Sequence, residues 1–120
     1  MIGGGHALVT GAAGAIGAAI ARSLVTRGLA RSLTLVDVDR TGAERVGASL
    51  GAAWRAEAWD LAEPSALAER VRALEAEHGA IDVLVNCAGV MEIRSLVATE
   101  WSTASRLLRI DLESPLLLMS

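Results

Sequence analysis

The sequence predicts one α/β domain built on a parallel β-sheet with helices on both faces. Short apolar runs alternate with segments of helical periodicity, and the stretches between successive runs are long enough to hold a helix. A chain of 120 residues is long enough for one hydrophobic core. With 52% hydrophobic and 21% charged residues, it is too apolar for a disordered chain and too interrupted by charge for a membrane span.

The first half of the chain predicts two strand–helix units. The apolar run 6–10 is typical of a buried parallel strand, and residues 15–27 carry apolar side chains at helical spacing. Residues 32–37 predict a second strand, and residues 41–50 a second helix that ends just before Gly51.

The second half continues the alternation. Residues 53–59 predict a weaker third strand, residues 64–78 a helix with proline in its first turn, and residues 81–86 a fourth strand. A last helix is expected from about residue 99 to the end. A kink is expected near Pro115, because proline cannot continue the helical hydrogen bonds.

A glycine turn joins the first strand to the first helix. The segment Thr10–Gly17 has glycines at positions 11, 14 and 17. Without side chains, the backbone lets an anion reach the free N–H groups of the helix N-terminus, as the pyrophosphate of a dinucleotide requires. A turn without a ligand is the alternative in a chain with 12 glycines, but the strand–turn–helix context favours the phosphate site.

Asp37 ends the second strand, 20 residues beyond Gly17. An acid at this position accepts a hydrogen bond from the 2′-OH of an adenosine ribose and repels a 2′-phosphate, so the sequence favours NAD over NADP. Arg40 lies close enough to keep NADP as an alternative. The other interpretation makes Asp37 and Asp39 solvated loop acids or helix caps.

These segments, together with Asp60-Leu61 and Asn86-Cys87-Ala88-Gly89, occur in the order typical of short-chain dehydrogenases/reductases, and nearly the whole chain resembles that family. The resemblance implies a Rossmann-type doubly wound sheet, an NAD(P) cofactor and hydride transfer between nicotinamide and an alcohol or carbonyl compound. It also implies that Asp60 hydrogen-bonds the adenine and Leu61 lines its pocket. The segment 86–89 would stabilise the sheet and border the cofactor.

The expected cofactor-binding residues belong to the glycine turn and to the segments that follow the second, third and fourth strands. They are Thr10, Gly11, Gly14, Ala15, Ile16, Gly17, Asp37, Asp60, Leu61, Asn86, Ala88 and Gly89. The classical subfamily has its middle glycine where Ala15 stands, whereas Gly14 matches the extended subfamily. The segment 86–89 looks classical, so the subfamily stays open. Cys87 replaces an Asn of the family and is interpreted as a small core residue.

The chemistry of the family rests on a Tyr-x-x-x-Lys pair and a Ser, yet this sequence contains neither Tyr nor Lys. Asp111 stands where the family usually has the Asn that supports a proton relay, and it is the one catalytic candidate. A helix-surface acid without a catalytic role is the equal alternative for Asp111. His6 and His78 are expected to lie far from the carboxyl ends of the strands, where ligands bind.

We therefore expect the N-terminal, nucleotide-binding part of a short-chain oxidoreductase, truncated after the fourth strand and the following helix. The expected strand order 3-2-1-4 leaves the fourth strand as an open edge. The isolated chain should then be weakly stable, self-associate, or be made as part of something longer. A cofactor-binding module without catalysis and a fragment without function are the two alternatives.

The remaining expectations concern partners and location. A net charge of −3 without a basic field argues against nucleic acid as a partner. A single cysteine and the absence of a secretory signal favour the cytoplasm. The segment Thr99-Glu100-Trp101 resembles the start of the family's long interface helix, so a homo-oligomer would form there. Residues 90–96 are expected to border a substrate, with packing as the equal alternative for Met91, Ile93 and Leu96.

Overall fold

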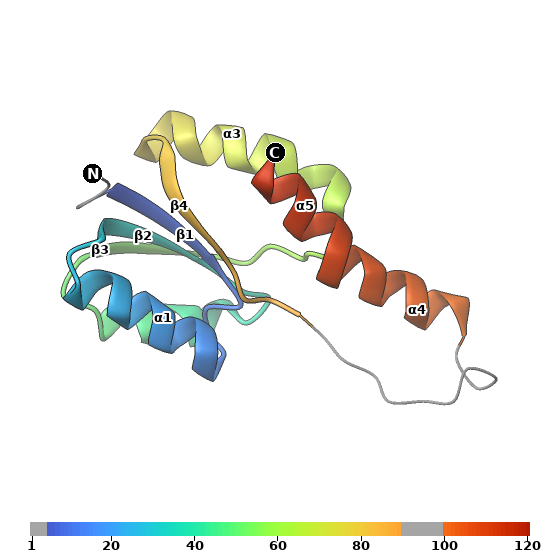
Figure 1. The fold of residues 1–120 in the computed structure, drawn as a ribbon, viewed down its shortest axis with the longest axis horizontal. Coiled ribbons are helices and arrows are strands. Elements are labelled where there is room, and N and C mark those ends of the chain that lie inside the picture. Colours follow the sequence, from blue (N-terminus) through green and yellow to red (C-terminus); the bar gives the residue numbers. More distant parts are fainter. Residues whose placement is uncertain (1–4, 90–99) are drawn as a thin grey trace.

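The computed structural model describes residues 5–89 and 100–120. Its centre is a four-stranded parallel sheet (Figure 1). The strands are β1 (Gly5–Thr10), β2 (Ala30–Val36), β3 (Ala53–Glu57) and β4 (Ile81–Asn86). Their order is β3-β2-β1-β4, which confirms the predicted order and the doubly wound class.

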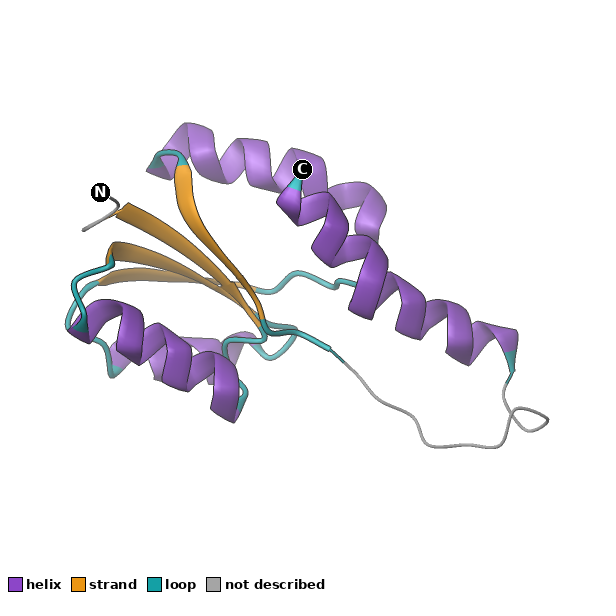
Figure 2. Cartoon of the chain, viewed as in Figure 1, coloured by secondary structure: helices purple, strands orange, loops and turns teal. Residues whose placement is uncertain are grey.

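Helices cover both faces of the sheet (Figure 2). On one face lie α1 (Ala15–Thr26) and α2 (Arg40–Ala48), and on the other lie α3 (Leu67–His78) and α5 (Ser114–Met119). Successive side chains of a strand point to opposite faces of the sheet, so each strand contributes to the packing against both helix layers. In β1, Ala7 and Val9 pack with α1 and α2, whereas Leu8 packs toward α3. This burial on both faces explains why β1 is a continuous apolar run.

The predicted elements are confirmed with small shifts at their ends. The predicted third strand ends at Glu57, two residues early, and a 3₁₀ turn, η1 (Pro64–Ala66), precedes α3. Beyond the fourth strand the described chain resumes with α4 (Trp101–Leu108). Among the residues that the structure describes, no helix has both the length and the hydropathy needed to cross a bilayer.

The helix around Pro115 is irregular, at the place where a kink was predicted. A π-helical segment, η3 (Arg109–Glu113), joins α4 to α5. Pro115 has no N–H group, so it cannot donate to the carbonyl of Asp111 four residues earlier. The π-helical turn widens the helix directly before Pro115 and accompanies this lost bond.

The carboxyl ends of the strands meet at one edge of the sheet. Thr10 is in register with Val36 on one side and with Asn86 on the other, and Val36 is in register with Glu57. The loops that follow these strands are therefore neighbours. At the outer edge, β4 is only half-buried, as expected for a strand that is paired on one side within the described sheet.

Candidate functional site

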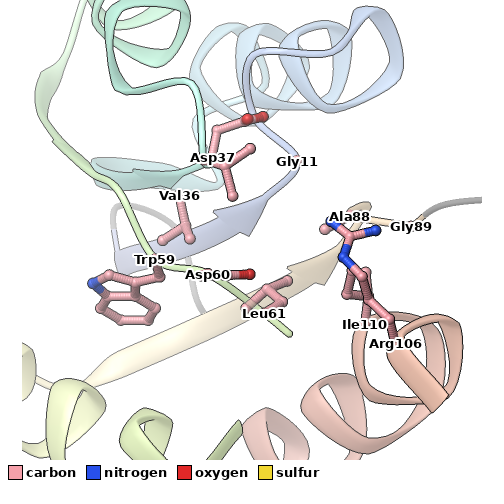
Figure 3. A pocket seen from close by; sticks show the side chains of 11 residues that line it. Gly11, Val36, Asp37, Trp59, Asp60, Leu61, Ala88, Gly89, Arg106 and Ile110 are labelled. Carbon is pink, nitrogen blue, oxygen red and sulfur yellow. The ribbon is translucent and has the colours of Figure 1, made fainter. Parts of the chain in front are cut away.

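A pocket of about 550 Å³, partly open to solvent, lies where these loops meet (Figure 3). Its lining comes from the four segments that follow the strands and from the helix at the end of the chain: Gly11, Val36, Asp37, Val38, Trp59, Asp60, Leu61, Ala88, Gly89, Arg106 and Ile110. Six of these are residues that the sequence singled out: Gly11, Asp37, Asp60, Leu61, Ala88 and Gly89.

The glycine turn packs too tightly for side chains at two of its three positions. Gly11 has a φ of +65°, and a Cβ there would lie 2.8 Å from the backbone nitrogen of Ala88. A Cβ on Gly17 would overlap the carbonyl oxygen of Gly11. Gly14 leaves more room, because its Cβ would lie 3.4 Å from that same oxygen. The first and third glycines are thus required by the packing of the turn itself.

Helix α1 begins immediately after this turn. Gly14 is its N-cap residue, and the Gly14 carbonyl accepts the Ala18 N–H at 2.9 Å. The N–H groups of Ala15, Ile16 and Gly17 belong to the first turn, where no intrahelical acceptor exists. Ala15 and Ile16 are exposed. The first turn of α1 thus leaves N–H groups without helical acceptors close to Gly11, and the helix dipole favours an anion there. Gly14, Ala15, Ile16 and Gly17 do not line the pocket themselves.

Asp37 is held by backbone N–H groups on both of its carboxylate oxygens. Oδ2 accepts from Ala13 in the glycine turn, and Oδ1 accepts from Asp39, each at 3.0 Å. The helix-capping role falls to Asp39 instead, whose Oδ1 accepts the Gly42 N–H at 2.9 Å. The two acids therefore differ: Asp39 caps α2, whereas Asp37 lies in the pocket lining.

Thr10 joins the glycine turn to the loop after β4. Its buried hydroxyl oxygen accepts the N–H groups of Cys87 and Ala88 at 3.1 and 3.2 Å, and the hydroxyl donates to the Val85 carbonyl at 3.4 Å. Thr10 thereby positions Ala88 without lining the pocket. Asn86 is not brought to this pocket, because it lines a separate hollow between β4, α3 and α5.

The loop after β3 forms a third wall. Asp60 is exposed, and its Oδ1 accepts the Ala62 N–H at 2.9 Å, whereas Leu61 is buried. Two side chains from the C-terminal helix hold this loop. Ser114 Oγ donates to the Leu61 carbonyl at 2.6 Å, and Arg109 Nε donates to the Ala62 carbonyl at 2.9 Å.

The remaining titratable candidates lie outside the pocket lining. Asp111 is exposed on η3 beside Gly89, where a Cβ on that glycine would lie 3.4 Å from Asp111 Oδ1. His6 lies at the opposite end of β1 from Thr10, with Nε2 2.8 Å from Thr34 Oγ1. His78 ends α3 and pairs with Arg55. Both histidines are remote from the pocket, as expected.

The sequence also matches the profile of the family described as short chain dehydrogenase, over residues 5–120. The chain belongs to this family. Among curated relatives, it is 44% identical over 90 residues to D-threitol dehydrogenase of Mycolicibacterium smegmatis, which corresponds to 72% of this chain and 34% of the relative.

Solved structures of family members agree with the fold. A metagenomic short-chain oxidoreductase in complex with NADP superposes with a TM-score of 0.90 at 35% identity, covering 98% of this chain and 54% of that one. The 3-ketoacyl-(acyl-carrier-protein) reductase of Brucella melitensis, complexed with NADH, gives 0.83 at 28% identity, covering 99% and 48%. The chain thus spans about half the length of these family members, and about a third of the threitol enzyme.

Sequence reasoning about this family member missed five of the lining residues: Val36, Val38, Trp59, Arg106 and Ile110. Four of them stand next to predicted residues, since Val36 and Val38 flank Asp37, Trp59 precedes Asp60 and Ile110 precedes Asp111. Adjacency was the available signal for these. Arg106 has no such signal, because long-range packing of α4 brings it to the pocket. Residues 90–96 and Thr99, expected near a substrate and an interface, lie outside the described residues.

Proposed function

We propose that this chain binds NAD(P) in the pocket at the carboxyl edge of its sheet, as the nucleotide-binding part of a short-chain oxidoreductase. The observation that carries the proposal is the hydrogen bond from Ala13 of the glycine turn to Asp37. This bond fixes a carboxylate suited to ribose hydroxyls beside a helix N-terminus suited to a pyrophosphate.

The residues present fit such a ligand. The first turn of α1 would hold the pyrophosphate, and Gly11, in the pocket lining, would border it. Asp37 would accept hydrogen bonds from the adenosine ribose. The adenine would lie between Leu61 and Ile110, with Asp60 at its polar edge. The bound dinucleotide would supply the hydride acceptor or donor.

NAD is the preferred cofactor in this proposal. The Asp37 carboxylate would repel a 2′-phosphate at the position where it would accept a ribose hydroxyl. Arg40, the first residue of α2, is exposed nearby and is the cation through which NADP would be accommodated. The solved relatives include one with NADP and one with NADH, so the preference rests on Asp37 itself.

The proposed reaction of the whole protein is hydride transfer between nicotinamide and an alcohol or carbonyl compound. The names of relatives such as D-threitol dehydrogenase support this class of reaction. These 120 residues contain no Tyr and no Lys, so we assign them binding and orientation of the dinucleotide. Asp111, beside Gly89, is proposed to stand at the proton-relay position. A non-catalytic NAD-binding module is the second candidate, favoured by the same lack of Tyr and Lys.

The outer face of the C-terminal helix is the proposed site of self-association. Large apolar side chains are exposed there at helical spacing on α4, η3 and α5: Trp101, Leu108, Leu112, Leu116 and Met119. We call these five residues the apolar stripe. An exposed stripe of this kind is typical of an interface, and two copies of the helix would cover each other's stripes.

Asp37→Ala tests the binding site and its cofactor preference together. We expect weaker NADH binding and unchanged or tighter NADPH binding, because the variant loses both the ribose acceptor and the repulsion of a 2′-phosphate. Titrations that follow cofactor fluorescence measure both affinities. Asp39→Asn is the matched control, since it removes a neighbouring charge and keeps the capping oxygen. Equal losses for NADH and NADPH in Asp37→Ala would contradict the assigned role.

A further inference from the structure

Arg106 is the one basic residue among the described residues that line the pocket, where it faces two acids, Asp37 and Asp60. It enters from α4, on the side opposite Asp37. Figure 3 shows its guanidinium extending from the helix toward the side of the pocket formed by Ala88 and Gly89.

In the part of the chain that the structure describes, the Arg106 guanidinium forms no polar contact that would stabilise the fold. Within residues 5–89 and 100–120, it forms no hydrogen bond and no salt bridge. Arg109, three residues further, behaves differently, because its guanidinium bonds the Ala62 carbonyl and the Ser105 hydroxyl. Arg109 thus holds the helix in place, whereas Arg106 presents a charge to the pocket.

The surroundings of Arg106 suit a flat aromatic ring. Ile110 lies four residues later, one helical turn away, so both side chains face the pocket from the same side of the helix. Leu61 adds apolar lining to the same pocket, and Val36 and Trp59 line it on the side away from Arg106 (Figure 3). A planar guanidinium stacks on the π face of an aromatic ring or a nucleobase. The ammonium group of lysine is not planar and cannot stack in this way.

We propose that Arg106 stacks on the adenine of the bound dinucleotide and covers it from the α4 side. The inference rests on the proposed function and adds a residue that sets affinity for the adenosine half of the ligand. Because the contact is to the ring, the stack serves NAD and NADP alike. The proposed role of Arg106 is therefore independent of the discrimination between NAD and NADP at Asp37.

The test compares three variants of the full chain with ADP-ribose and NADH as ligands. Arg106→Ala removes the stack, and Arg106→Lys keeps the charge but loses the plane. We expect each of these two variants to bind ADP-ribose and NADH with about three- to tenfold lower affinity, as is typical of losing a stacked cation. Arg72→Ala, on the exposed side of α3, is the matched loss of an arginine and should leave both affinities unchanged. Circular dichroism checks that every variant is folded.

Salt separates the stack from a phosphate contact. A stacking loss should persist at high salt, whereas an ion pair with the pyrophosphate would be screened. Full recovery by Arg106→Lys, or a loss that vanishes at high salt, would overturn the stack in favour of a phosphate contact. Unchanged binding by Arg106→Ala would overturn this inference alone. Failure of the unaltered chain to bind either ligand would defeat the proposed function itself.

Discussion

At the residue scale, the glycine turn shows that three similar positions carry different constraints. Gly11 needs its positive φ, Gly17 needs to lack a Cβ, and Gly14 has room for one. The two neighbouring acids divide in the same way, because Asp37 bonds the turn and Asp39 caps a helix. The sequence motif gives all these residues one shared role in cofactor binding, whereas the packing gives each of them a separate role.

Gly17→Ala should destabilise the fold. Its new methyl group would overlap the Gly11 carbonyl oxygen, and α1 would have to move away from the turn. We expect a loss of about 1–3 kcal/mol in the free energy of unfolding, measured by urea denaturation. Gly14→Ser is the matched control, because the site has space and serine caps helices well, so its stability should be kept or raised. Equal stability of the two variants would contradict the different packing of the two glycines.

At the element scale, the C-terminal helix, formed by α4, η3 and α5, has one buried face and one exposed face. Ile110 and Ser114 are buried against the sheet side, where Ser114 bonds the Leu61 carbonyl. The opposite face carries the apolar stripe, whose Trp101 side chain is 73% exposed. Such exposure is unusual for large apolar side chains that recur along one helix face, and it supports the self-association proposed above.

Leu112→Glu should therefore reduce self-association. Leu112 lies in the middle of the apolar stripe and is exposed, so a charge there costs the fold little but opposes burial between two copies. Sedimentation velocity should show a lower mass for this variant than for the unaltered chain. Ala73→Glu, at an exposed position of α3, is the control and should leave the mass unchanged. A monomeric unaltered chain would remove the proposed interface.

At the scale of the whole molecule, the sheet separates two hydrophobic cores formed by the described residues. One core joins β1 and β2 to α1 and α2, and the other joins them to α3 and the C-terminal helix. The pocket lies at the edge where both layers end. Its walls therefore come from loops of both layers, and its shape depends on how the C-terminal helix docks on the loop after β3.

This arrangement explains which features were predictable. The strands, the helices and the glycine turn follow from local periodicity and spacing, so they were predictable from the sequence. The strand order was predicted from the Rossmann class that the family resemblance implies. The contributions of Arg106 and Ile110 to the pocket depend on contacts such as Ser114 with Leu61, which join residues far apart in the chain. The π-helical segment was missed for a related reason, because a proline predicts a disturbed helix but not the form that the disturbance takes.

The dinucleotide site is tested most simply by titrating the unaltered chain with NADH, followed by cofactor fluorescence and by displacement with ADP-ribose. We expect saturable binding that ADP-ribose reverses, because the proposed contacts to Asp37, Asp60 and the first turn of α1 all lie on the ADP-ribose part of the dinucleotide. If the chain is folded and shows no saturable binding of NADH, this pocket is not a dinucleotide site.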